Sequence, residues 1–153
     1  MTTIILATQN PGKIREMRAL LADSRISILG LSELGRDFDE PEETGTTFLA
    51  NATIKAQAYA QATGHWCLAD DSGLEVDTLG GAPGVISSHY AFDGDADGEA
   101  ATMTREQRDA KNIQRLLDDL DGVKDRTARF VCTMVLAKPT SLPSRAGLQP
   151  ASS

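Results

Sequence analysis

The sequence predicts an α/β fold with a mixed central sheet flanked by helices and incomplete at its C-terminal side. Residues 3–7 (TIILA) form a continuous apolar run, which is typical of a strand covered on both faces. Residues 48–62 are rich in alanine and other good helix formers. Residues 126–137 carry the alternating pattern of a long strand. Strands that alternate with helices along one chain favour a sheet with helices packed against it.

The length and composition indicate one domain. With 153 residues, 41% of them hydrophobic, the chain is long enough to bury a sizeable core. We assign this domain to residues 1–137. Residues 138–153 are rich in Pro, Ser, Ala and Gly and have neither a helical nor a strand period. We expect this tail to be disordered.

The charge balance argues against a nucleic-acid partner. The chain has 15 basic and 22 acidic residues, a net charge of −7, and lacks the basic patch that nucleic acids need. No apolar run approaches the roughly 18 residues of a membrane span, and the N-terminus has no basic leader. Cys67 and Cys132 lie in apolar runs and are expected to be buried free thiols. We therefore expect a cytoplasmic protein without a membrane partner.

A polar loop follows the first strand. The segment Thr8-Gln9-Asn10-Pro11-Gly12-Lys13 leads into residues 14–21, whose apolar positions recur at helical spacing. Such a loop turns free backbone N–H groups and the positive end of a helix dipole towards one point, which suits an anion. Lys13 stands where the dipole favours acids, and a bound polyphosphate would explain it. The segment is not a Walker A loop, and an ordinary strand-to-helix connection is the alternative.

The next segments supply acids and a second lysine. Residues 26–29 are expected to form a second strand, and residues 35–47 an acidic loop that contains Glu42-Glu43. A run of acids is usually only solvated surface. Lys55 lies on the helix over residues 48–62, among small apolar neighbours. Its long side chain either reaches solvent or points into a cleft.

The stretch around Asp70 and Asp71 is central to the functional hypothesis. Residues 66–69 read as a short buried strand that ends at Asp70-Asp71-Ser72-Gly73. Two adjacent carboxylates at a strand end are costly unless a positive charge lies against them. A divalent cation with phosphate oxygens would supply that charge. The alternative is a plain turn, which Asp, Ser and Gly favour for local backbone reasons.

The following segment contains an acidic loop and a helix. Residues 85–92 are expected to be strand or loop. Residues 93–98 (DGDADG) look like the start of an EF-hand loop, but the twelfth position is Thr104 instead of glutamate, so we read them as an acidic loop. Thr104 and Gln107 form a capping box at the start of a helix that extends to Leu120.

Taken together, these segments resemble the inosine/xanthosine triphosphate pyrophosphatase family, hydrolases of non-canonical purine nucleotides. The resemblance extends roughly from Thr2 to Ala137, with the motifs in the family's order and spacing. The motifs are Thr8–Lys13, Glu42–Phe48, Asn51-Ala52 with Lys55-Ala56, Ala69–Leu74, Leu79–Gly84, Asn112–Leu117 and Arg126–Phe130.

The resemblance implies hydrolysis of ITP, dITP and XTP to the monophosphate and pyrophosphate, with Mg²⁺ as cofactor, in a homodimer. The chemistry agrees, because the reaction needs a metal, cations that hold phosphate oxygens, and a carboxylate that orients a water. The implied residues are Thr8, Gln9, Asn10, Pro11, Gly12 and Lys13 on the triphosphate, Lys55 facing the phosphates, Ser72 on the substrate, Glu42 (with Glu43 competing) and Asp71 on Mg²⁺, and Asp71 as general base.

The sequence also departs from the family. Its members continue with a GFGYDP-like segment, a lysine and a Ser-His-Arg triplet that read the purine, and none is present here. Neither His65 nor His89 lies in such a context. We therefore expect a truncated product with a tail outside the family's domain. Two alternatives follow: a catalytically impaired fragment that only binds phosphate, metal or a partner subunit, and a nucleotide-binding module without hydrolysis.

Overall fold

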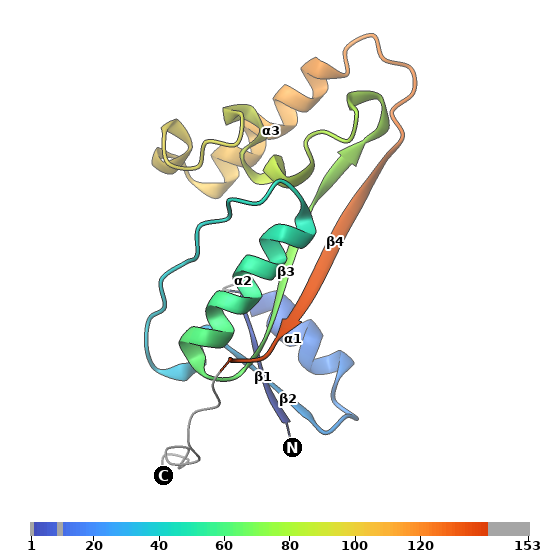
Figure 1. Cartoon of the computed structure of the whole chain (residues 1–153). Coiled ribbons are helices and arrows are strands. Elements are labelled where there is room, and N and C mark those ends of the chain that lie inside the picture. The colour runs from blue at the N-terminus through green and yellow to red at the C-terminus, as the bar shows by residue number, and fades with distance from the viewer. Residues whose placement is uncertain (1, 9–10, 141–153) are drawn as a thin grey trace. The chain divides into compact units, whose positions relative to one another are not determined.

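The computed structural model describes residues 2–8 and 11–140 (Figure 1). Gln9, Asn10 and most of the predicted tail lie outside the described residues. The described chain divides into two compact units. Their described residues fall within 2–43, 52–70 and 134–140 for the first unit, and within 44–51 and 71–133 for the second.

A four-stranded sheet in the order β2-β1-β3-β4 organises the fold. The central strand β1 (Thr2–Leu6) pairs in parallel with β2 (Ile26–Gly30) on one side and with β3 (Trp66–Val76) on the other. Its apolar run is continuous because both of its faces are covered. The strands expected from residues 3–7 and 26–29 are confirmed.

The last strand makes the sheet mixed. β4 (Ala128–Ala137) lies at the edge, beside β3 (Figure 1). Arg129, near the start of β4, contacts Glu75 and Asp77 at the end of β3, so the two strands run antiparallel. The predicted mixed α/β sheet is therefore confirmed.

Two helices pack on opposite faces of β1. Successive side chains of a strand alternate between its faces. Ile4 and Leu6 accordingly join Ile14 of α1 (Pro11–Leu20) in one apolar cluster. Ile5 joins Ala56 of α2 (Phe48–Thr63) in another. Ala56 and Ala60 of α2 are buried in this cluster, so the alanine-rich segment forms the expected helix and packs one of its faces on the sheet.

The second unit is built around α3 (Arg105–Asp119). Its predicted capping box is present: the Thr104 side chain accepts from the Gln107 N–H, and the Gln107 side chain accepts from the Thr104 N–H. α3 packs on a 3₁₀-helical segment, Gly84–Phe92, which covers the residues 85–92 where we expected strand or loop. The side chain of Asn112 in α3 forms hydrogen bonds with the backbone of that 3₁₀-helical segment.

The expected strand end at Ala69 is wrong, because β3 continues to Val76. Its backbone groups find partners beyond Ala69: the N–H of Leu74 donates to Ser87 Oγ at 2.9 Å, and that of Val76 to the Ala82 carbonyl at 3.0 Å. No turn is therefore needed at Asp70-Asp71. In an extended strand these two neighbours leave on opposite sides, which removes much of the repulsion between them.

The two cysteines have different environments. Cys67 is a buried free thiol, as expected, and burial raises its pKa to about 12. Cys132 is also free but exposed, so the expectation that it is buried is wrong. It lies on the β4 face that also carries Phe130, Met134 and Leu136, all of which are exposed. Alternation placed these side chains on one face but could not show that this face is uncovered.

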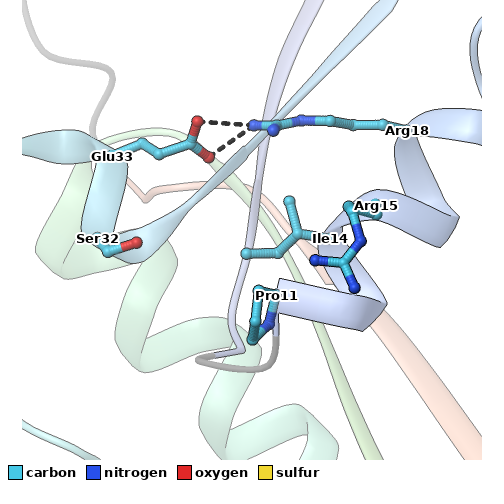
Figure 2. Close-up of a pocket in the computed structure, with 6 residues that line it drawn as sticks. All are labelled: Pro11, Ile14, Arg15, Arg18, Ser32 and Glu33. Carbon is cyan, nitrogen blue, oxygen red and sulfur yellow. Dashed lines mark hydrogen bonds and ion pairs between the residues drawn. The ribbon is translucent and has the colours of Figure 1, made fainter.

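A pocket of about 220 Å³ lies beside α1 (Figure 2). Arg18 donates from Nη2 to both carboxylate oxygens of Glu33, at 2.8 and 2.6 Å, and the Gly30 N–H donates to the same carboxylate at 2.7 Å. These bonds lower the pKa of Glu33 below its ordinary 4.5. The pair thus ties α1 to the end of β2. The lining residues are Pro11, Ile14, Arg15, Arg18, Ser32 and Glu33.

Replacing Glu33 by glutamine should lower the stability at pH 7 by about 0.5–1 kcal/mol, since the pair is partly exposed. A carboxyl with a lowered pKa contributes stability above its unfolded-state pKa and loses it as the pH falls through the folded-state value. The difference from wild type should therefore disappear below the pKa of Glu33. Urea unfolding over a pH series from 7 downwards measures it, with exposed Glu16→Gln on α1 as control. A difference that stays constant throughout the series would contradict this.

Candidate functional site

In the first unit, Lys13 contacts Asp70. α1 begins at Pro11, which places Lys13 in its first turn, where the helix dipole favours an acid. The Lys13 ammonium forms an ion pair with the Asp70 carboxylate, whose side chain is only 11% exposed. The negative charge of Asp70 therefore offsets the unfavourable interaction of Lys13 with the helix dipole.

Lys55 contacts the same residue from α2. Its ammonium pairs with Glu43 and also donates to the Asp70 backbone carbonyl at 3.2 Å. The Lys55 side chain is 17% exposed, so the alternative in which it reaches out to solvent is wrong. One strand residue, Asp70, thus touches both lysines, one through its side chain and one through its backbone.

Contacts that share Asp70 therefore link four residues from separate segments of the first unit: Lys13, Glu43, Lys55 and Asp70. We call them the lysine–carboxylate cluster. Phosphate oxygens can take the place of carboxylate oxygens on a lysine ammonium, since both are anionic acceptors of charge-assisted hydrogen bonds. The cluster is consequently suited to receive a polyphosphate.

The second unit holds the other predicted residues. Asp71 is half-buried, and its Oδ1 accepts from the Ser72 N–H at 3.1 Å, while Ser72 is exposed. Gly73 is buried, and a Cβ there would lie 2.4 Å from the Gly84 carbonyl oxygen. Only glycine fits this approach of β3 to the following segment.

Each predicted residue can now be placed. Thr8 follows β1, and Pro11 and Gly12 open α1 with Lys13. Lys13 and Lys55 both contact Asp70. Glu42 and Glu43 are both exposed, and Glu43 is the one that pairs with Lys55. We did not expect a role for Asp70 from the sequence. The signals that could have found it were the unusual position of Lys13 and the presence of a second aspartate beside Asp71.

The resemblance assigns Mg²⁺ to carboxylates: Glu42 or Glu43 in the first unit and Asp71 in the second. Carboxylate oxygens are hard donors of the kind that Mg²⁺ takes. Among residues 2–8 and 11–140, no three His, Cys, Asp or Glu side chains gather into a group that could hold a metal ion by themselves. Mg²⁺ commonly uses one or two carboxylates together with substrate phosphates and waters, so it does not need such a group. Within the same residues, no helix has the length and apolar character of a membrane span.

Comparison with known proteins identifies the family. A model of the Ham1 family matches residues 4–147. The chain belongs to the Ham1 family. It is 45% identical over 146 residues to a dITP/XTP pyrophosphatase of Photorhabdus laumondii, covering 94% of this chain and 67% of the relative. A dITP/XTP pyrophosphatase of Vibrio parahaemolyticus is 47% identical over 94% of this chain and 66% of its own length.

Solved Ham1 structures share the fold. A HAM1 protein from Coxiella burnetii aligns with a TM-score of 0.73 and 38% identity, over 94% of this chain and 67% of that one. The Ham1 protein of Staphylococcus aureus aligns with a TM-score of 0.72 and 39% identity, over 92% and 65%. The chain thus spans about two thirds of the length of the Ham1 proteins it matches. The family inferred from the motifs is confirmed.

Proposed function

We propose that the chain hydrolyses non-canonical purine nucleoside triphosphates (ITP, dITP and XTP) to the monophosphate and pyrophosphate with Mg²⁺. The observation that carries the proposal is the lysine–carboxylate cluster, found in a chain 45% identical to a dITP/XTP pyrophosphatase. Two lysines beside two carboxylates match a charged triphosphate better than they match a neutral substrate.

Lys13 and Lys55 bind and orient the phosphate oxygens in this mechanism. Both ammonium groups are already positioned by carboxylates, Lys13 by Asp70 and Lys55 by Glu43. The nucleotide exchanges these acceptors for its own oxygens. Cations fixed in advance stabilise charge on a transferring phosphoryl group without reorganising during the reaction. In the loop from Thr8 to Lys13, the residues other than Pro11 add backbone N–H donors.

Asp71 acts as the general base. It accepts a proton from the water whose oxygen attacks the α-phosphorus, and the bond to the bridging oxygen breaks to release pyrophosphate. Ser72, next to Asp71 in the chain, contacts the substrate. Glu42 or Glu43, together with Asp71, would hold Mg²⁺, which when bound would neutralise phosphate charge. The half-buried position of Asp71 suits a base that is partly shielded from solvent.

Pyrophosphate release tests the proposal. We expect release from ITP, dITP and XTP in the presence of Mg²⁺, and none after chelation by EDTA. ATP and GTP serve as comparison substrates, because they differ only in the purine. Calorimetry in parallel measures nucleotide binding. Binding without release of pyrophosphate would show that the protein is a nucleotide-binding module and not a hydrolase.

We further propose that the protein is a homodimer, as the resemblance implies, and that it is cytoplasmic, as its composition suggests. Size-exclusion chromatography with light scattering measures the mass directly. A monomeric mass at micromolar concentration would contradict the dimer.

A further inference from the structure

We propose that Ser87 is a positioning residue for the β3 segment that carries Asp71 and Ser72. The inference rests on the proposed function, because it concerns the residues assigned to that reaction. Ser87 acts through the backbone that bears them.

The Ser87 hydroxyl replaces a strand partner. It accepts from the Leu74 N–H at 2.9 Å and donates to the Gly84 carbonyl oxygen at 2.6 Å. Both bonds are partly buried. In a regular sheet the Leu74 N–H would bond to a neighbouring strand, whereas here one side chain links it to the turn at Gly84. Loss of the hydroxyl leaves a donor and an acceptor without this partner, which costs more than the bond itself contributes.

Because Gly73 has no side chain, the backbone of β3 can lie close to Gly84 and Ser87. A Cβ at Gly73 would lie 2.4 Å from the Gly84 carbonyl oxygen, 2.6 Å from Ser87 Oγ and 2.9 Å from a ring carbon of Phe48. The backbone of β3 therefore lies directly against the Gly84–Ser87 turn. Ser87 fixes the chain one residue beyond Gly73, and Asp71 stands only two residues before Gly73.

The support under Ser87 is itself held by α3. The Asn112 side chain donates to the Ser88 carbonyl at 2.9 Å and accepts from the Ala91 N–H at 2.9 Å. Tyr90, in the same segment, donates its hydroxyl to Asp119 at 2.7 Å. A side chain on such a support can hold a catalytic segment in place, since positioning needs a rigid second layer.

Replacing Ser87 by alanine should lower kcat about tenfold, since small displacements of a reacting group are costly. KM should change by less than about twofold, because Lys13 and Lys55 still bind the phosphates. Ser87→Thr keeps the hydroxyl and should restore most of kcat. Ser88→Ala is the matched control: Ser88 is exposed, and its hydroxyl lies 2.8 Å from Nδ1 of His89.

Hydrogen exchange gives a readout that does not depend on activity. In Ser87→Ala the Leu74 amide should exchange faster, while the Val76 amide, bonded to the Ala82 carbonyl at 3.0 Å, should stay protected. A uniform rise in exchange, or a fall in kcat that follows the loss of folded protein in circular dichroism, would show a purely structural role. Unchanged kcat and unchanged Leu74 exchange would also overturn the proposal. If wild type releases no pyrophosphate, the proposed function fails, whereas the Leu74 amide still tests the Ser87 contact.

Discussion

Replacing Asp71 by asparagine should abolish pyrophosphate release from ITP while leaving the protein folded. Asparagine keeps the size of the side chain and an oxygen that can accept from the Ser72 N–H, which now lies 3.1 Å from Asp71 Oδ1. It cannot take a proton from water at neutral pH and is a weaker metal ligand. General-base catalysis contributes about 10²–10⁴-fold, so the loss should be at least of that order.

The measurement is kcat from pyrophosphate release, with ITP binding followed by calorimetry. Asp77→Asn is the control, since Asp77 lies just beyond β3, is exposed and pairs with Arg129. Both variants should bind ITP, but only the control should turn it over. Turnover by Asp71→Asn within about tenfold of wild type would show that the base is another residue.

Replacing Lys13 by alanine should weaken the binding of every purine triphosphate by a similar factor. A hydrogen bond to a charged group is worth about 1.5–3 kcal/mol, which corresponds to roughly 10- to 150-fold in Kd. The effect should not depend on the base, because Lys13 is assigned to the phosphates. The same substitution leaves the largely buried Asp70 carboxylate without this lysine, which adds repulsion towards an incoming triphosphate.

Calorimetric titration with ITP, XTP and ATP measures the change in Kd for each of the three nucleotides. Arg15→Ala provides the control, because Arg15 lies on the same helix, is exposed and carries the same charge. A loss confined to one base would contradict the phosphate role of Lys13. An equal loss of affinity in Arg15→Ala would show that the effect comes from the net charge of the protein and not from a contact of Lys13 with phosphate.

The elements that sequence reasoning placed correctly are those with local signals. β1 is continuous and apolar because helices cover both of its faces, and α3 starts at a capping box that is visible in the letters. The strand end at Ala69 was wrong because the partners of Leu74 and Val76 lie further along the chain, at Ser87 and Ala82. These tertiary hydrogen bonds outweigh the local preference of Asp, Ser and Gly for a turn.

The site was predicted in part for similar reasons. The motifs singled out Lys13 and Lys55, and the structure brings both to Asp70. The pairing of Lys13 with Asp70 joins residues 57 positions apart, which no local pattern specifies. Glu42 and Glu43 carry the same signal in an acidic loop, and only the contact of Glu43 with Lys55 separates them.

The uncovered face of β4 affects how the protein should be handled. Phe130 is 87% exposed, and Met134 and Leu136 are 46% and 47% exposed on the same edge strand, beside the free thiol of Cys132. Apolar side chains on an open edge promote self-association in concentrated samples, and an accessible thiol oxidises to intermolecular disulfides in air. Purification should therefore use fresh reductant and low protein concentrations, and a Cys132→Ser chain should store longest.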